Sequence, residues 1–364
     1  MSLNRRSFIR NIGLIAGYSL IPSSHLFSNT PNKKLGVCLV ALGNYSTSIL
    51  APALQLTKHC RLTGIVTGTP SKIPVWQKKY GIPDKNVYNY ENMGRIANNP
   101  DIDVIYIVLP TGLHAKYAIK AANTGKHVWC EKPMAKTEKE CQSIIEACRK
   151  NKVKLSIGYR MQHEPNTQQV MKWATTKPYG DIKEVYAEIG YNVRTPEKSW
   201  RLDTELGGGT MYDLGVYALN AARYATKEEP ISVIAEQITT RPNIFTETDE
   251  TTHFTLEFPS GAKAYGKTSV GHDMHRLRVN SNNGWYQLQP FSMYAGVQGE
   301  TSDGKLLNTY IENQQAKQMD DDALSIINNT DVLVPGEEGI KDIRIVESIY
   351  KSAKNKKKIN LINY

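Results

Sequence analysis

The stretch LGVCLVALGNYSTSILAPALQ, residues 35–55, is the part of the sequence that decides the fold. Its first residues form a continuous apolar run with β-branched members, which is typical of a strand buried on both faces of a parallel sheet. A turn of small residues follows, and the chain then has the pattern of a helix. A buried strand, a tight turn and a helix together indicate the first unit of a doubly wound α/β sheet.

Units of the same kind continue to about residue 155. Apolar runs predict strands at 60–69, 103–110, 127–133 and 154–160, and helical patterns lie between them at 71–81, 90–100, 112–126 and 138–150. Because strand and helix alternate strictly, the sequence predicts a doubly wound parallel sheet of the Rossmann type. We therefore expect an N-terminal cofactor-binding domain over residues 31–155.

The pattern of apolar residues changes after this domain. Segments such as 182–193 and 251–270 alternate apolar and polar residues with period two, and turn signals such as Asn283-Gly284 separate them. This pattern predicts an α+β domain at 156–364 with a large, mostly antiparallel open sheet and a closing helix. A chain of 364 residues is long enough for two cores, and a cleft between two domains is a common place for a ligand.

The first thirty residues have a composition of their own. Arg5 and Arg6 precede Phe8-Ile9, and the apolar stretch 12–21 is too short to span a bilayer unaided. This combination resembles a twin-arginine export signal, so residues 1–30 are excluded from the predicted fold and a periplasmic location is expected. A basic N-terminal helix is the alternative. We predict no stable membrane span in the mature chain.

Charge and cysteine content exclude several classes of protein. The formal net charge of +10 is spread along the chain, and no nucleic-acid motif accompanies it, so we expect no nucleic-acid partner. Five cysteines without paired spacing argue against a disulfide framework or a zinc site, and no metal site is predicted. Cys141 and Cys148, on a predicted helix, are expected to face the core.

Two segments bear on the cofactor. The positions of the dinucleotide fingerprint after the first strand hold Ala41, Gly43 and Ser46, small residues that would let a pyrophosphate approach the backbone. The second strand is not followed by the Asp or Glu that would bind the ribose of NAD. Hydroxyls and a cation stand there instead, which favours NADP over NAD; the residues are Thr67, Gly68, Thr69 and Lys72.

Lys132 ends the fourth predicted strand, at the carboxyl edge of the sheet where such folds place their ligands. The next residue, Pro133, restricts the backbone and allows a cis peptide bond, which would give the lysine a defined direction. A solvated loop lysine is the alternative interpretation.

Four motifs, CEKPMA (130–135), GYRMQHEPN (158–166), SWRLDTELGGGTMYDLGVYALNAARY (199–224) and PGEEGIKDIR (335–344), resemble the Gfo/Idh/MocA oxidoreductase family. Within it, the glucose-fructose oxidoreductase branch is the most similar. The resemblance runs from about Leu35 to the last helix. It implies a sugar or polyol substrate between the two domains, and an open sheet that often forms the interface of a homodimer or homotetramer.

The resemblance also implies roles for individual residues. Lys132 would hydrogen-bond the reacting hydroxyl, Tyr217 would exchange its proton with a pKa lowered by nearby Lys132, and Asp213 would orient the sugar or the lysine. Tyr159 and Arg160 would line the sugar site with these three residues. The implied cofactor contacts are Ala41, Gly43, Asn44, Tyr45, Thr67, Gly68, Thr69, Lys72, Pro110, Thr111, His114, Glu131, Lys132, Trp200 and Arg201. A packed histidine is an equal alternative for His114.

The expected function is therefore an exported, NADP-dependent oxidoreductase acting on CH-OH groups of sugars. It would move hydride between C1 of an aldose, or a related sugar or polyol carbon, and nicotinamide, in a ping-pong cycle if the cofactor is retained. Two alternatives fit the same residues. One is an NAD-dependent glycoside hydrolase acting by transient oxidation, and the other is a non-catalytic protein that binds sugar or nucleotide.

Overall fold

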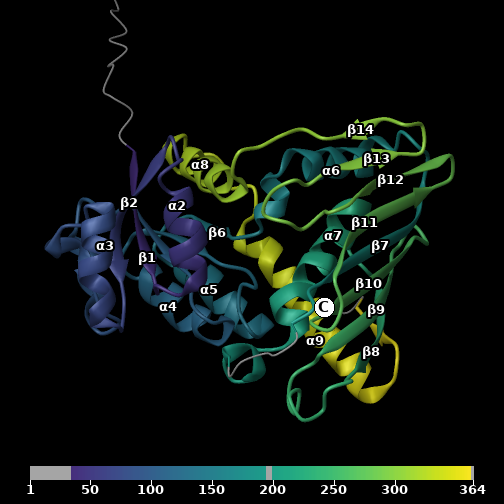
Figure 1. Ribbon diagram of the computed structural model, residues 1–364, viewed down its shortest axis with the longest axis horizontal. Coiled ribbons are helices and arrows are strands. Elements are labelled where there is room, and N and C mark those ends of the chain that lie inside the picture. Colours follow the sequence, from purple (N-terminus) through teal and green to yellow (C-terminus); the bar gives the residue numbers. More distant parts are fainter. Residues whose placement is uncertain (1–33, 194–198, 362–364) are drawn as a thin grey trace, which may run out of the picture. The chain divides into compact units, whose positions relative to one another are not determined.

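The computed structural model describes residues 34–193 and 199–361. Over these ranges the chain forms one compact unit built on two β-sheets, one of six strands and one of nine (Figure 1). The predicted export signal, residues 1–30, lies outside the described residues. Among the helices of the described ranges, none combines the length and apolar character that a bilayer span requires.

Sheet A is parallel, with strand order β3-β2-β1-β4-β5-β6. Its strands are β1 (Leu35–Val40), β2 (Cys60–Val66), β3 (Val87–Tyr88), β4 (Val104–Ile107), β5 (His127–Cys130) and β6 (Leu155–Ile157). β4 is buried along its whole length, as expected for a sheet with helices on both faces. The predicted doubly wound parallel sheet is confirmed. The winding direction changes between β1 and β4, which is where such sheets bind ligands.

The helices around sheet A agree with the sequence in three of five places. The α-helices are α2 (Ala51–Ala53), α3 (Ile73–Tyr80), α4 (His114–Ala122) and α5 (Glu138–Lys150), and the short 3-10 or π segments are η1 (Ser46–Leu50), η2 (Pro70–Lys72), η3 (Asp84–Asn86), η4 (Asn92–Asn98) and η5 (Thr111–Leu113). A capping box between Thr137 and Glu140 starts α5. The helix expected after β1 begins as the π turn η1, and the one expected at 90–100 is the 3-10 segment η4.

Sheet B has the order β14-β13-β12-β11-β7-β10-β9-β8-β15, and only the β7–β10 pair is parallel within the described residues. Its strands are β7 (Ile182–Gly190), β8 (Ser232–Ile238), β9 (Thr251–Glu257), β10 (Lys263–Ser269), β11 (Met274–Ser281), β12 (Gly284–Leu288), β13 (Gly299–Thr301), β14 (Leu306–Leu307) and β15 (Ile359–Asn360). The predicted mostly antiparallel sheet is confirmed, and burial alternates along β9 as its period-two pattern indicated.

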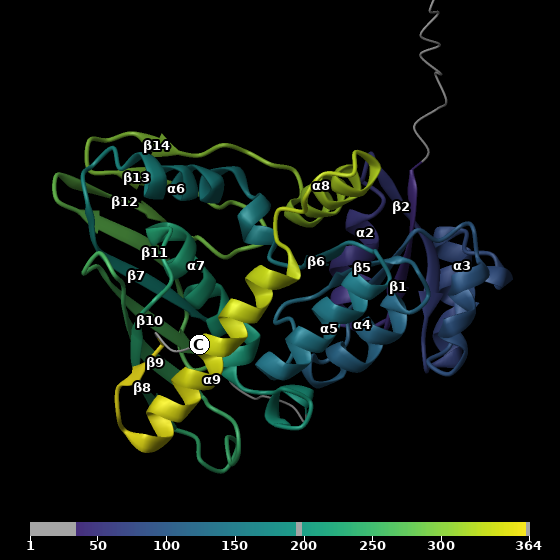
Figure 2. The same ribbon diagram turned by 180° about the vertical axis from the view of Figure 1, so that it is seen from behind.

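One face of sheet B is covered by helices and the other is open (Figures 1 and 2). The remaining helical segments are η6 (Arg160–His163), α6 (Pro165–Thr176), η7 (Trp200–Leu202), η8 (Met211–Gly215), α7 (Val216–Thr226), α8 (Gln314–Ile327) and α9 (Gly336–Asn355). α7 packs on β7 and α9 packs on β8. Tyr186 and Tyr265 stack with ring centroids 5.1 Å apart on neighbouring strands of the open face.

Helix α8 follows most of sheet B in the sequence but packs on sheet A. Its Ala316, Met319 and Ala323 join the core that covers one face of sheet A, beside β2 and η1. Figure 2 shows α8 next to β2. Full burial of a methionine side chain contributes about 1.5–3 kcal/mol, so Met319 holds this crossing firmly. The residues after 313 therefore connect the two sheets.

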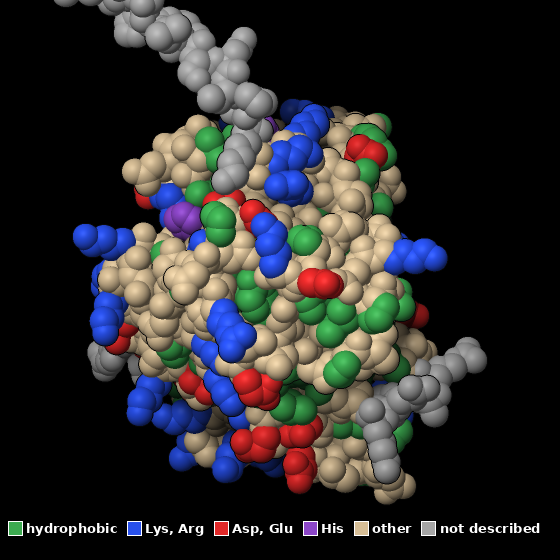
Figure 3. Space-filling view, turned by 90° about the vertical axis from the view of Figure 1, so that its left-hand side faces the viewer, with side chains coloured by type: hydrophobic (Ala, Val, Ile, Leu, Met, Phe, Trp, Pro, Cys, Tyr) green, Lys and Arg blue, Asp and Glu red, His purple; other side chains and the backbone are tan. Residues whose placement is uncertain are grey.

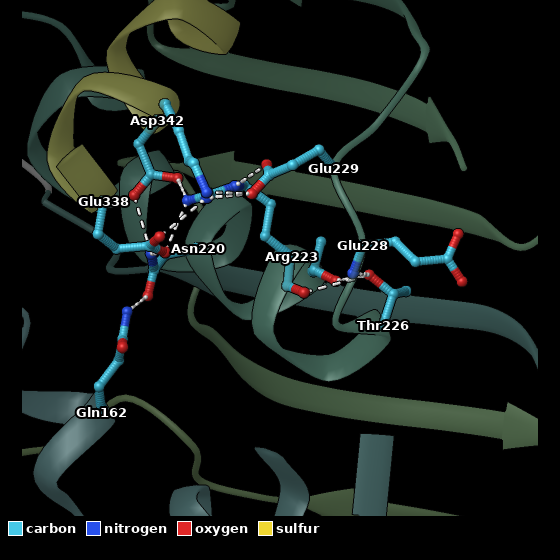
Figure 4. Close-up of polar contacts among 10 residues, drawn as sticks. Gln162, Asn220, Arg223, Thr226, Glu228, Glu229, Glu338 and Asp342 are labelled. Atoms are coloured by element: carbon cyan, nitrogen blue, oxygen red, sulfur yellow. Dashed lines mark hydrogen bonds and ion pairs between the residues drawn. The ribbon is translucent and has the colours of Figure 1, made fainter. Parts of the chain in front are cut away.

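A buried ion network joins α7 to α9 (Figure 4). The Arg223 guanidinium lies 2.6 Å from Asp342 and 2.9 Å from Glu338, both on α9, and 2.8 Å from Glu229. Asn220 donates to Asp342 and accepts from Gln162 on η6. This network holds the helix that carries Tyr217 against the last helix of the chain.

Charges on the surface that carries α3 are mixed. Figure 3 shows Lys and Arg side chains interspersed with Asp and Glu side chains on this side of the molecule. The five cysteines of the sequence all lie in the described residues, where they are buried and unpaired. Cys141 and Cys148 pack in the core as predicted.

Candidate active site

The turn after β1 has the shape of a phosphate-binding loop although it lacks the first glycine. Ala41 takes the left-handed backbone conformation, with φ of 74°, and its carbonyl accepts a hydrogen bond from Ser46 Oγ at 2.7 Å. Gly43 and Asn44 are exposed, and a Cβ added to Gly43 would meet no atom within 4 Å. Open space over small residues at the end of β1 fits a pyrophosphate.

The end of β2 approaches the same loop. The Lys72 ammonium donates to the carbonyl oxygen of Leu42 at 2.6 Å, which brings a positive charge to the loop. Gly68 and Thr69 are exposed, whereas Thr67 is buried and its hydroxyl accepts from the amide of Thr69 at 3.1 Å. Thr67 therefore shapes the turn, and its role as a cofactor contact stays a prediction.

Lys132 comes from sheet A and reaches the C-terminal domain. It follows β5, and its peptide bond to Pro133 is cis. Its ammonium donates to the main-chain carbonyl of Asp213 at 2.7 Å and lies 4.6 Å from the ring centroid of Tyr217. The predicted meeting of a lysine from one domain with a tyrosine from the other is thus present in the structure.

Glu131 is buried under this lysine. One carboxylate oxygen accepts from the Tyr106 hydroxyl at 2.6 Å and the other from the Lys132 amide at 3.2 Å. Burial raises the pKa of Glu131. Gly158 packs so closely that an added Cβ would lie 2.8 Å from a Glu131 oxygen. We predicted Glu131 as a cofactor contact, but it is enclosed and supports the Lys132 backbone instead.

Asp213 lies on η8, a π turn that leads into α7. Its carboxylate pairs with Arg201 Nε at 2.6 Å, so it is the main-chain carbonyl, not the carboxylate, that holds Lys132. Arg201 and Trp200 form η7, with the guanidinium carbon 4.8 Å from the Trp200 ring. Trp200 is partly exposed and Arg201 is exposed.

Tyr217 lies at the start of α7 with 7% of its surface exposed. Burial raises the pKa of its hydroxyl to about 12, and the positive charge of Arg160 acts in the opposite direction. The expectation that Lys132 brings the pKa of Tyr217 down toward the working range is therefore wrong. The lysine stands over the ring face, where a cation contacts the π-electrons of the ring.

Tyr159 and Arg160 lie behind the site rather than in it. Tyr159 is buried in the core, and its ring packs edge-on against Tyr217 with centroids 6.3 Å apart. Arg160 has 2% of its surface exposed and lies under the rings of Tyr217 and Tyr294. Their prediction as direct sugar contacts is corrected, because neither presents surface to a ligand.

The residues that follow β4 are packed and support the loop that follows Lys132. Both ring nitrogens of His114 face carbonyl oxygens, Nδ1 that of Pro133 at 2.8 Å and Nε2 that of Leu109 at 2.7 Å. His114 is therefore packed, as the alternative interpretation held, and fixes the loop that follows Lys132. Pro110 is half-buried, and Thr111 is buried against Gly207, where an added Cβ would lie 2.7 Å from the threonine.

Three residues of the C-terminal domain, two at the ends of strands of sheet B and one in a loop, complete the site, and sequence reasoning missed them. Tyr294 is 47% exposed, and its ring centroid lies 6.1 Å from that of Tyr45 across the two domains. Tyr191 and His275 pack with centroids 4.7 Å apart at the adjoining ends of β7 and β11. Two of these residues lie at strand ends and one lies in a loop, and none is part of a recognisable motif. In the sequence, a tyrosine or histidine at the end of a period-two segment was the one indication of a site residue.

These groups can exchange a proton with a polar substrate. A cation, Lys132, and a protonated phenol, Tyr217, stand next to each other, and half-exposed aromatic rings surround them. Aromatic faces pack well against the apolar faces of a pyranose, and the ammonium can donate to a hydroxyl or carbonyl oxygen.

Comparisons with known proteins agree with this arrangement. Residues 35–159 match "Oxidoreductase family, NAD-binding Rossmann fold", and residues 167–287 match "GFO/IDH/MocA C-terminal domain". Among curated relatives, the chain is 25% identical over 345 residues to D-xylose 1-dehydrogenase (NADP+) of Haloarcula marismortui, covering 89% of this chain and 92% of that protein. It is also 25% identical to scyllo-inositol 2-dehydrogenase (NADP+) of Bacillus subtilis, covering 85% and 91%.

A solved structure is more similar. The crystal structure of aldose-aldose oxidoreductase from Caulobacter crescentus, complexed with glycerol, has a TM-score of 0.87 and 36% sequence identity to this chain. The match covers 90% of this chain and 100% of the other chain. Both domains of the fold, and not the Rossmann domain alone, are therefore shared.

Proposed function

Because the chain belongs to the Gfo/Idh/MocA oxidoreductase family, we propose that it moves hydride between nicotinamide and C1 of an aldose, or a related sugar or polyol carbon. The observation that carries the proposal is the 4.6 Å approach of the Lys132 ammonium to the Tyr217 ring, because it joins groups from both domains. The curated D-xylose and scyllo-inositol dehydrogenases and the aldose-aldose oxidoreductase support a sugar-like substrate.

NADP is the cofactor, in keeping with the two curated NADP-dependent relatives. The open space over Gly43 and the exposed Asn44 would receive the pyrophosphate, and the Lys72 ammonium beside the loop would stand near the 2′-phosphate. The family resemblance implies that Arg201 and Trp200 would cover the nicotinamide half, and the ion pair of Arg201 with Asp213 supports this. When bound, NADP supplies the hydride acceptor, and NADPH the hydride donor, for the sugar carbon.

The chain itself supplies the proton chemistry. Lys132, held by the Asp213 carbonyl, would donate a hydrogen bond to the reacting sugar oxygen and stabilise negative charge on it. The phenol of Tyr217 is protonated at neutral pH because burial raises its pKa, so it is ready to donate a proton when a sugar is reduced. In the oxidation direction the same hydroxyl must first release its proton, and nearby positive charge favours that release.

The test is hydride transfer to NADP. Purified protein is mixed with NADP and an aldose panel that includes D-xylose and D-glucose, and absorbance of reduced nicotinamide is followed. We expect Lys132→Met and Tyr217→Phe to lower kcat by about 10²–10⁴-fold. Tyr310→Phe, at a tyrosine that is 85% exposed, is the matched control and should have the activity of the parent.

Two results would contradict the proposal. One is a spectrum that stays unchanged with every aldose although NADP binds. The other is release of free sugar from aryl glycosides without net reduction of NADP, which would favour a redox-assisted hydrolase. A Tyr217→Phe variant with full activity would remove the proposed role of the phenol.

We propose further that the protein is exported and retains its cofactor. The arginine pair Arg5-Arg6 supports export by the twin-arginine route, which carries folded proteins, and a retained NADP would allow ping-pong exchange between two sugars. Cell fractionation of the parent and of the Arg5→Lys/Arg6→Lys variant tests export. Mass spectrometry of nucleotide released from denatured protein tests retention, because an empty protein with full activity on added NADP would exclude it.

The open face of sheet B supports a homodimer or homotetramer. It carries a hollow of about 910 Å³ and two isoleucines on β8, Ile234 and Ile238, that are 50% and 41% exposed. Sedimentation velocity should show an oligomer that Ile234→Lys shifts toward monomer. A monomeric parent would contradict this part of the proposal.

A further inference from the structure

Arg160 is a buried cation whose hydrogen-bond partners are all uncharged. Its guanidinium donates to the carbonyl oxygens of Ser292 and Met293 and to the side-chain oxygen of Gln314, and it contacts the sulfur of Met161. Over residues 34–193 and 199–361 no carboxylate forms an ion pair with it. The other nearly fully buried arginine, Arg223, pairs with three.

A buried charge without a counter-ion is expensive, so its position indicates a use. The guanidinium carbon lies 5.3 Å from the ring centroid of Tyr217 and 4.6 Å from that of Tyr294. Both rings belong to the site, and their faces contribute part of the stabilisation that a carboxylate would otherwise supply. The neutral hydrogen-bond partners leave the charge of Arg160 to act at the Tyr217 hydroxyl. The carboxylates of Glu131 and Asp213 act there in the opposite direction and raise the pKa of Tyr217.

We propose that Arg160 is a positioning residue whose uncompensated charge stabilises the ionised form of Tyr217 during proton exchange, an inference that rests on the proposed function of this site. Lys132 is a poorer candidate for this role, because its ammonium is directed to the Asp213 carbonyl and stands over the ring face. Burial raises the pKa of Tyr217, and Arg160 is the strongest influence that lowers it.

The sharpest test changes the charge next to Arg160 without changing Arg160. Gln314→Glu keeps an oxygen that accepts from the guanidinium but adds a carboxylate, which would pair with Arg160 and reduce its field at Tyr217. Gln314→Met is the matched control, because it also loses the hydrogen bond from Gln314 to Met293 but adds no charge. If Gln314 only holds the structure together, the two variants should change the ionisation of Tyr217 equally.

The readout is the ionisation of residue 217 itself. Tyrosine 217 is replaced by 3,5-difluorotyrosine, whose phenol is more acidic than that of tyrosine, and its midpoint is followed by ¹⁹F NMR. We expect Gln314→Glu to raise the midpoint by about one pH unit relative to Gln314→Met, in line with the effect of a nearby charge. Equal midpoints, or a lower midpoint in Gln314→Glu, would overturn the proposal.

A second pair covers the case in which Gln314→Glu fails to fold. Arg160→Lys keeps the charge and Arg160→Met removes it, so the midpoint should stay near the parent in the first and rise by about one unit in the second. The same shift should appear in the pH dependence of kcat with NADP and D-xylose. If the parent proves inactive on every aldose, the proposed function fails, while the NMR midpoints still decide the role of Arg160.

Discussion

Removal of Arg223 should destabilise the protein strongly, because its charge is paired inside the fold. Its most deeply buried partner is Asp342, which has no exposed surface and lies 2.6 Å away. Breaking a buried pair on one side costs about 3–5 kcal/mol, since the other charge is left without its partner. Glu229 is about half exposed, and its pair with Arg223 adds at most about 1 kcal/mol. We expect Arg223→Met to lower the free energy of unfolding by about 4 kcal/mol at pH 8.

This loss should depend on pH in a defined direction. Burial raises the pKa of Asp342 to about 6, although Arg223 lowers it. Between its unfolded value of about 4 and this pKa, the folded state binds more protons than the unfolded state, so stability falls as the pH rises through that window. Without Arg223 the pKa is higher still, and the fall continues to higher pH. At pH 5 more of Asp342 is protonated in both proteins than at pH 8, so the deficit should be smaller.

Urea unfolding at pH 8 and pH 5, followed by far-UV circular dichroism and tryptophan fluorescence, measures both effects. Arg276→Met is the control, because Arg276 and Glu188 form a half-exposed pair worth about 0–1 kcal/mol. The double variant Arg223→Met/Asp342→Asn should be more stable than Arg223→Met alone, since it also removes the buried carboxylate that has lost its partner. A deficit below about 1.5 kcal/mol at pH 8, or one that is the same at both pH values, would refute the reasoning.

Three more predictions concern the cofactor loop and the packed histidine. Gly43→Ala should leave the urea midpoint unchanged, since its Cβ meets no atom, but should weaken NADP binding about tenfold or more, as measured by isothermal calorimetry. Gly94→Ala, which also adds a Cβ in open space, should leave NADP affinity unchanged. Lys72→Glu should lower the ratio of NADP to NAD affinity by at least about tenfold, because the new carboxylate repels a 2′-phosphate, and an unchanged ratio would exclude the predicted contact. Burial lowers the pKa of His114, so the folded parent binds fewer protons there than the unfolded chain and should lose stability as the pH falls below about 6.5. His114→Gln should flatten that dependence, and equal slopes in both proteins between pH 7 and 5 would count against it.

The Rossmann domain was predictable because its signals are local. Buried strands of a parallel sheet are continuous apolar runs, and Gly81 ends α3 in the left-handed conformation that a helix end favours. The short strand β3 was not predicted, because two residues carry no period, and the segment 90–100 was predicted as a helix but forms the 3-10 segment η4. Local patterns thus identify long elements and miss short ones.

The candidate site was only partly predictable. Lys132 and Tyr217 were found through motifs, and the structure brings them together. The same motifs suggested that Tyr159 faces the sugar. Whether a side chain points into the core or into the site depends on which helix packs against its segment, and the motifs do not show that packing. Tyr294 was missed because it lies in a loop and reaches the site only through the packing of the two domains.

Local patterns of residues were enough to predict the order of strands and helices, the small-residue loop after the first strand and the position of a lysine at the sheet edge, since each depends on neighbouring residues. Which buried charges have a carboxylate partner depends instead on the packing of distant segments. Arg160 and Arg223 are both buried, yet one meets carbonyls and the other carboxylates that are distant in the chain. Their different chemistry follows from the electrostatics of those packed neighbours, which no local pattern of residues encodes.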